Sequence, residues 1–131
     1  MSPITESRKT ATPDRMSPTG LVCLRSDTVG MAHVVVAGEL DIASCPQLDR
    51  EVRGAPDDIG TIVLDLREVT FMDSAGMHLM LEADDRIRSA GRRLLVVRGP
   101  AAVGRLFEVM GVETRLECVD RPPGEPDHVL S

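Results

Sequence analysis

Aromatic residues are almost missing from this sequence, which contains two phenylalanines and neither tyrosine nor tryptophan. The core must therefore be aliphatic, and the aromatic platforms on which proteins stack single-stranded nucleic acid are lacking. Positive charge is also scarce, since 15 basic residues face 21 acidic ones and the formal net charge is −6. Because a protein that holds a phosphate backbone needs the opposite sign, we expect no direct binding to nucleic acid.

Long apolar runs and paired cysteines are missing as well. No run approaches the roughly 20 apolar residues of a membrane span, and residues 1–20 lack the apolar region of a signal peptide. The three cysteines, Cys23, Cys45 and Cys118, are odd in number and share no C-x-x-C or other metal-ligand spacing. These absences predict a cytoplasmic protein with buried or free thiols, without a cysteine metal site and without membrane insertion.

The sequence does contain enough apolar material for one core, because 42% of its 131 residues are hydrophobic. Most of them lie in residues 21–119, where we expect a single folded domain. Residues 1–20 and 120–131 are rich in polar residues, proline and charge, and cannot bury enough surface to offset the entropy lost on ordering. Both ends are therefore predicted to be disordered tails.

Hydrophobic periodicity switches repeatedly within this domain and predicts the element order ββαβαβαβ. Two short β-branched runs should form an antiparallel opening pair, after which helices and strands alternate. Strands separated by helices pair in parallel through right-handed crossovers, so the expected fold class is α/β, with a mixed central sheet and helices packed against it. The expected strands lie within residues 21–25, 32–38, 60–69, 92–99 and 114–119, and the expected helices within residues 42–54, 74–91 and 100–111.

Two of these strands should lie at the centre of the sheet. The runs TIVLDL (61–66) and RRLLVV (92–97) lack the polar alternation of a half-exposed strand, which indicates cover on both faces. We therefore expect them to be parallel neighbours. Their most buried side chains should include Ile62, Leu64, Leu95 and Val97.

A junction between strand and helix, TFMDSAGMHLM at residues 70–80, brings together an acid, a hydroxyl and a glycine. Asp73 suits the N-cap of the helix, and its charge favours the positive helix end. Ser74 should then lie exposed in the first turn, where a phosphate would face free backbone N–H groups. Gly76 indicates either tight packing of the helix on a strand or close approach of another molecule. Asp and Ser are also common capping residues, so a purely structural role is open for both.

A second polar junction, GELD at residues 38–41, lies like DSAG between a strand end and a helix start, where the sites of such sheets gather. Glu39 and Asp41 could form a catalytic or metal-binding pair. A solvated loop with a capping aspartate is the favoured interpretation.

Both motifs lie within longer stretches, and a third stretch follows them: VVAGELDIASCPQLDREV, TIVLDLREVTFMDSAGMHLMLEADDRIRSAGRRLLVV and PAAVGRLFEVMGV. Together these stretches resemble the STAS domain of bacterial anti-sigma factor antagonists. The resemblance spans almost the whole of the expected domain. Its strongest marks are GELD and, further along, DSAG after a VLDL strand; each motif is weak alone, but their order and spacing are specific.

This resemblance implies a phosphorylatable binding module rather than an enzyme. Ser74 would be the phosphoacceptor of a partner anti-sigma factor of the serine kinase type, with Asp41, Asp73 and Gly76 on the partner-binding surface. In its unphosphorylated form the protein would bind the anti-sigma factor, release a sigma factor and permit transcription, and a phosphatase would reset it. The kinase would supply ATP and magnesium, so this chain would need no cofactor.

Two alternatives rest on other chemistry. Ser74 could be a nucleophile with His78 as its base, but the G-x-S-x-G elbow and a group to orient the histidine are missing, so we expect His78 to be partly buried or on the surface. A receiver-type phosphoacceptor at Asp65 would need an acidic pair after the first strand and a late lysine, and the only lysine is Lys9. We therefore interpret Asp65 as a strand-end residue facing the loops.

A closer alternative keeps the STAS fold and changes its function. STAS domains also occur in stress-signalling assemblies and as cytosolic pieces of anion transporters, and some resemble nucleotide binders. This sequence has no glycine-rich phosphate loop and no membrane span. The alternative is therefore a module of a stress-signalling assembly or a separate partner of a transporter, with nucleotide binding left open.

Overall fold

The computed structural model describes residues 20–124, so most of the tails predicted at residues 1–20 and 120–131 lies outside the described range. Of the remaining tail residues, 120–124 are described and Pro122 is buried. The element order is ββαβαβαβ, as predicted. The elements are β1 (Leu21–Thr28), β2 (Met31–Leu40), α1 (Cys45–Arg53), β3 (Thr61–Met72), α2 (Ser74–Ser89), β4 (Arg93–Val97), α3 (Ala101–Met110) and β5 (Cys118–Val119).

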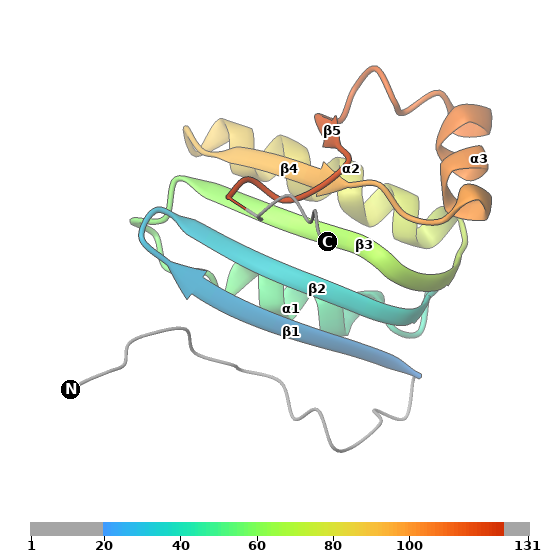
Figure 1. The fold of residues 1–131 in the computed structure, drawn as a ribbon, viewed down its shortest axis with the longest axis horizontal. Coiled ribbons are helices and arrows are strands. Elements are labelled where there is room, and N and C mark those ends of the chain that lie inside the picture. Colours follow the sequence, from blue (N-terminus) through green and yellow to red (C-terminus); the bar gives the residue numbers. More distant parts are fainter. Residues whose placement is uncertain (1–19, 125–131) are drawn as a thin grey trace, which may run out of the picture.

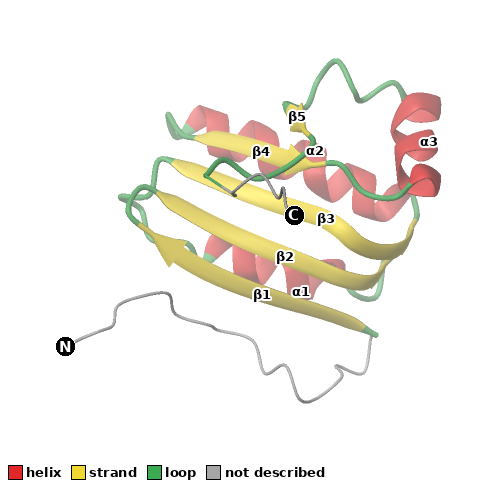
Figure 2. Cartoon of the chain, in the orientation of Figure 1, coloured by secondary structure: helices red, strands yellow, loops and turns green. Residues whose placement is uncertain are grey.

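The strands form one mixed sheet with the order β1-β2-β3-β4-β5 (Figures 1 and 2). β1 and β2 are antiparallel, and each later pair of neighbours is parallel. β3 is thus the central strand and β4 its parallel neighbour, which confirms the prediction from the two unbroken apolar runs. The four side chains expected to be most buried, Ile62, Leu64, Leu95 and Val97, are at most 2% exposed.

The main hydrophobic core lies between the sheet and the helices. Figure 1 shows α1 and α2 together behind the sheet and α3 at its end. Along β3, Ile62 and Leu64 belong to this core, whereas Val63 joins a smaller cluster with Leu95 and Val97. Successive side chains of a strand point to opposite faces, so the two clusters cover both sides of β3. None of the helices in residues 20–124 is long and apolar enough to cross a membrane.

β3 is longer than the sequence pattern indicated, and this corrects one interpretation. The strand continues to Met72, so Asp65 lies in its middle, and the interpretation of Asp65 as a strand-end residue facing the loops is wrong. The strand persists because its later residues still pair with β2, through two irregularities in the β2 register. Asp65 therefore points from the sheet itself rather than from a loop.

The last strand is shorter than expected. Only Cys118–Val119 pair with β4, whereas residues 114–117 had been expected to be extended. In this segment the backbone N–H of Leu116 donates to the carbonyl of Val112 at 3.0 Å, so the chain turns. Leu116 is buried by that turn, and its apolar character reflects the core rather than a strand.

Candidate functional site

The junction between β3 and α2 presents Ser74 to solvent. Asp73 is the N-cap of α2, and its Oδ1 accepts hydrogen bonds from the backbone N–H groups of Ala75 at 3.0 Å and Gly76 at 3.3 Å. Ser74 is the first residue of the helix and is exposed. The cap thus fixes the backbone around Ser74 while leaving its hydroxyl accessible.

Gly76 owes its identity to packing within the domain. A Cβ atom at this position would lie 2.9 Å from Cγ of Met72, 3.0 Å from Cγ of Leu40 and 3.1 Å from the carbonyl oxygen of Leu40. Gly76 is itself buried. Of the two explanations considered from the sequence, tight packing of α2 on the strand ends is the one that the geometry supports.

The GELD junction forms a polar turn before α1. Oδ1 of Asp41 accepts from the backbone N–H groups of Ala43 and Ser44, both at 3.1 Å. The buried Ser44 hydroxyl donates to the carbonyl of Glu39 at 2.8 Å and accepts from the Asp41 N–H at 2.9 Å. Asp41 is therefore a capping residue of this turn, whereas Glu39 is exposed in β2. Residues 20–124 contain no group of three or more potential metal ligands.

The two junctions lie side by side because β2 and β3 are neighbours in the sheet, and their ends meet at the right in Figure 1. Leu40 is opposite Met72 in the register, and the backbone N–H of Asp73 donates to the carbonyl of Leu40 at 3.3 Å. Burial, and after it the charges of Asp73 and Asp41, raise the pKa of the nearby Cys45 thiol. The fold therefore brings together the acids of both motifs.

We call the region formed by Asp41, Ile42, Asp73 and Ser74 the Ser74 surface. The Ile42 side chain is 77% exposed beside the Asp41 turn. An apolar groove of about 380 Å³ begins at Met72, next to this surface, and runs between the end of β3 and α3. Exposed apolar side chains at the edge of a polar region are typical of surfaces that bind other proteins.

Two further side chains extend the apolar character of this end of the molecule. Phe71 at the end of β3 and Val109 on α3 both line the groove, and they are 50% and 78% exposed. The sequence pattern did not single out either residue. Whether an apolar side chain near the end of a helix or strand is exposed depends on which other elements pack against it. The groove thus adds residues that the motifs alone do not reveal.

The arrangement offers little support for a nucleophilic serine. Neither Ser74 nor His78 has a side-chain hydrogen bond within residues 20–124, and His78 is exposed on α2, in agreement with its expected place on the surface. Nucleophilic catalysis by serine needs a base within hydrogen-bond reach and a third group that orients the base. The geometry around Ser74 provides neither in this part of the chain.

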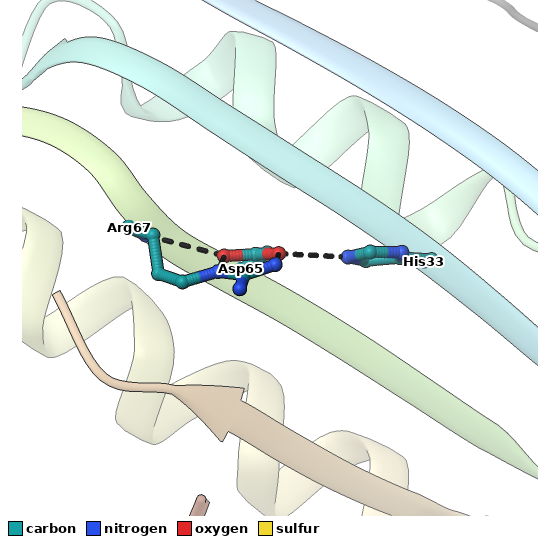
Figure 3. A network of polar contacts seen from close by, with 3 residues as sticks. All are labelled: His33, Asp65 and Arg67. Atoms are coloured by element: carbon teal, nitrogen blue, oxygen red, sulfur yellow. Dashed lines mark hydrogen bonds and ion pairs between the residues drawn. The ribbon is translucent and has the colours of Figure 1, made fainter. Parts of the chain in front are cut away.

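A polar network that the sequence analysis missed lies elsewhere on the sheet (Figure 3). Nε2 of His33 on β2 is 2.9 Å from Oδ2 of Asp65, and the Arg67 guanidinium donates to both carboxylate oxygens at 2.8 and 3.0 Å. Burial opposes ionisation of the Asp65 carboxyl, but the hydrogen bonds from His33 and Arg67 outweigh it and hold the pKa well below its usual range. Asp65 is thus a carboxylate whose partners come from the sheet, which argues against a phosphoacceptor role.

The cysteines are free thiols in the described part of the chain, as expected. Burial, with a smaller contribution from Glu51, raises the pKa of Cys23 to about 12. Burial also raises the pKa of Cys118. The thiolate is the reactive form of cysteine, so the environments of these side chains disfavour nucleophilic chemistry at neutral pH.

Comparison with known proteins agrees with the family resemblance that the motifs indicated. A family model described as "Mlab, STAS domain" matches residues 24–119. The chain is 32% identical over 83 residues to an anti-sigma-B factor antagonist of Staphylococcus aureus, covering 62% of this chain and 76% of that protein. It is 34% identical over 73 residues to osmosensory protein A of Mycobacterium tuberculosis; this match covers 56% of the chain and 46% of the relative, so it spans less than half of that protein.

Solved structures agree on the fold. An anti-sigma factor antagonist from Mycobacterium paratuberculosis superimposes with a TM-score of 0.68 at 21% identity, covering 82% of this chain and 92% of that one. The phosphorylated form of the Bacillus cell fate determinant SpoIIAA superimposes with a TM-score of 0.59 at 19% identity, covering 74% and 90%. The family match, the S. aureus relative and the paired GELD and DSAG junctions lead to one conclusion: the chain belongs to the STAS domain family, in the group of the anti-sigma factor antagonists.

Proposed function

We propose that this chain is a phosphorylation-controlled anti-sigma factor antagonist that acts through the Ser74 surface. Its unphosphorylated form binds an anti-sigma factor of the serine kinase type in the cytoplasm and thereby releases a sigma factor. Phosphorylation of Ser74 by that partner ends the binding, and a phosphatase restores it. The observation that carries the proposal is an exposed serine hydroxyl at a capped helix start, beside the Asp41 turn, in a chain of this family.

The accessibility of Ser74 supports a role as phosphoacceptor. The hydroxyl is exposed and makes no hydrogen bond within residues 20–124, so a kinase can approach it without breaking a contact of the fold. The Asp73 carboxylate already accepts the N–H groups of Ala75 and Gly76. A phosphate on Ser74 would therefore lie next to the negatively charged Asp73 carboxylate, which already caps the helix.

The energetics favour loss of binding over loss of folding. A phosphoserine carries about −1.5 to −2 charges at neutral pH, and a helix N-terminus stabilises a negative charge by about 0.3–1 kcal/mol. At a covered interface, two like unit charges about 4 Å apart repel by about 4 kcal/mol at an effective dielectric of about 20. This repulsion corresponds to roughly a thousandfold in affinity and exceeds what the helix end returns.

The relatives support the same assignment. The S. aureus relative is named an anti-sigma-B factor antagonist, and SpoIIAA has been solved in phosphorylated form. Residues of this chain that match the family motifs, Asp41, Asp73, Ser74 and Gly76, lie in or directly beneath the Ser74 surface. In this proposal Asp41, Asp73 and Ser74 contact the partner, whereas Gly76 positions α2 below them.

The first test is to locate the modified residue. The purified chain is incubated with ATP, magnesium and a cytoplasmic extract of its own cells, and phosphopeptides are mapped by mass spectrometry. We expect phosphate on Ser74, its loss in Ser74→Ala, and its retention in Ser89→Ala, which removes an exposed serine at the far end of the same helix. Phosphate on other residues alone would count against the proposal.

A further inference from the structure

A pocket lined by arginines lies at the opposite end of α2 from the Ser74 surface. It has a volume of about 170 Å³ and forms where the C-terminal ends of α1 and α2 meet the segment before β4. Arg86 lies about three turns beyond Ser74 on α2, about 18 Å along the helix axis. The lining residues of this arginine pocket are Val52, Arg53, Arg86, Ile87, Ala90 and Arg92.

Contacts within the domain hold two of its three guanidinium groups. Nη1 of Arg92 donates to the carbonyl oxygens of Pro56 at 3.0 Å and Ile59 at 3.1 Å. Nε of Arg53 donates to Oδ2 of Asp49 at 2.7 Å. Each guanidinium carries five N–H donors, so both retain donors beyond these contacts. The pocket therefore has prearranged donors from two separate segments.

Arg86 completes the pocket and leaves a donor unused. Its Nη2 atom is buried, yet it has no hydrogen-bond acceptor within residues 20–124. The nearest charge is Oδ1 of Asp49 at 3.6 Å, beyond hydrogen-bond distance. The Arg86 side chain as a whole is 33% exposed and makes no hydrogen bond within residues 20–124, so donors other than Nη2 are left for an acceptor from outside the chain.

The local charge is opposite to that of the whole chain. Three of the six lining residues are arginines and none is acidic, in a chain whose formal net charge is −6. Val52, Ile87 and Ala90 supply apolar walls, and charges of one sign between low-dielectric walls concentrate their field. Basic residues in the last turns of α1 and α2 also suit the negative helix ends. That role accounts for the positions of Arg53 and Arg86, whereas Arg92 lies outside both helices, in the segment before β4.

The size and geometry of the pocket select the ligand class. Pockets for drug-sized organic ligands are about 300–1,000 Å³, and the arginine pocket is smaller. It has room for one phosphate group and a few surrounding atoms. The planar guanidinium matches phosphate oxygens through two parallel hydrogen bonds. We propose that the arginine pocket binds the phosphate group of a small anion, at a site separate from the Ser74 surface.

Titration of the full chain with inorganic phosphate and with pyrophosphate tests this site. Two-dimensional amide NMR at constant ionic strength, balanced with chloride, reports binding residue by residue. We expect saturable shifts centred on Arg53, Arg86 and Arg92, with Ser74 unaffected. Arg86→Gln should weaken binding by about tenfold or more, because a charged donor to the anion is lost.

The matched control is Arg88→Gln, which removes the same charge from the same helix turn outside the pocket. Arg53→Gln is a second test, since its side chain is largely exposed and its loss should leave the fold intact. Binding that is kept in Arg88→Gln and weakened in both pocket variants supports the proposal. Equal weakening in all three variants, or shifts that chloride reproduces, would overturn it.

A final arm distinguishes a free anion from a lipid headgroup. Phosphatidylcholine vesicles with and without phosphatidic acid are sedimented with the protein. Cosedimentation that requires phosphatidic acid and Arg86 assigns the phosphate to a lipid, whereas pyrophosphate binding without cosedimentation assigns it to a soluble molecule. If neither pyrophosphate nor phosphatidic acid binds in an Arg86-dependent way, the pocket is not a phosphate site.

Discussion

At the scale of single residues, Asp73 fixes the start of α2 and Ser74 does not. Oδ1 of Asp73 accepts two backbone N–H groups, whereas the Ser74 hydroxyl is exposed. Loss of such a cap costs about 0.5–2 kcal/mol of the free energy of unfolding. We expect Asp73→Ala to lose about 1 kcal/mol in urea titrations, and Ser74→Ala to stay within about 0.5 kcal/mol of the parent. Equal losses in the two variants would contradict this division of roles.

Asp65 gives the protein a predictable response to acid. Its pKa is depressed in the folded state, so the unfolded chain binds more protons in the acid range. The stability that it contributes is present above the unfolded pKa of about 3.9 and is lost as the pH falls below that value. We expect Asp65→Asn to destabilise by about 1–3 kcal/mol at neutral pH, because charged hydrogen bonds are lost, and by less as the pH falls below about 4.

The measurement is the free energy of unfolding of both proteins in urea across this pH range. Glu68→Gln is the control, because it removes an exposed carboxylate from the same strand. A difference between Asp65→Asn and the parent that stays constant from neutral to acid pH would contradict the assignment. It would mean that the charge of Asp65 does not stabilise the fold.

The network around Asp65 also shows which side-chain contacts could be predicted from the sequence and which could not. Arg67 could have been paired with Asp65, because residues two apart on a strand share a face. His33 could not, since it reaches Asp65 only through the register between β2 and β3. Asp41, Asp73 and Ser74 were predictable as site residues because each belongs to a local motif. Their role in binding a partner stays a prediction.

At the scale of elements, the seating of α2 on the ends of β2 and β3 depends on Gly76. A methyl group there would lie 3.1 Å from a backbone oxygen that cannot move without disturbing β2. A permissive helix glycine gains up to about 1 kcal/mol when changed to alanine. We expect the opposite for Gly76→Ala, a loss of about 1 kcal/mol or more, because overpacking a core is costly.

Gly104 in α3 is the matched control. It also lies inside a helix, but a Cβ atom there would meet nothing within 4 Å. Gly104→Ala should therefore gain up to about 1 kcal/mol. Thermal melts of the two variants should move in opposite directions, and a gain in both would show that α2 packs loosely on the strands.

The element order could be predicted because hydrophobic period, capping residues and glycine stops are local signals. Asp73 and Pro100 mark the starts of α2 and α3, and Gly111 ends α3 with a φ of 67°. The length of β3 could not be predicted in this way, since its last residues stay extended by pairing with β2. The cap of α1 was also only partly readable: Ser44 is at the N-cap, but its hydroxyl bonds within the GELD turn and not to the helix.

At the scale of the whole molecule, two regions of different chemistry lie at opposite ends of α2. The Ser74 surface lies at the C-terminal ends of β2 and β3, and the arginine pocket lies at the C-terminal ends of α1 and α2. The helices are held by a core that spans both ends. A change of the exposed Ser74 side chain should therefore alter partner binding with little effect on the stability of the domain.

The measurement that tests this account most directly is calorimetric titration of the purified anti-sigma partner with Ser74→Ala, Ser74→Glu and Ser89→Glu at fixed salt. Ser89→Glu adds the same charge at an exposed position at the other end of α2. We predict that Ser74→Ala and Ser89→Glu bind like the parent, that Ser74→Glu loses most of its affinity, and that all three melt within a few degrees of the parent. If Ser74→Glu bound as tightly as Ser89→Glu, Ser74 would be only the first residue of a helix, and the proposed switch would be wrong.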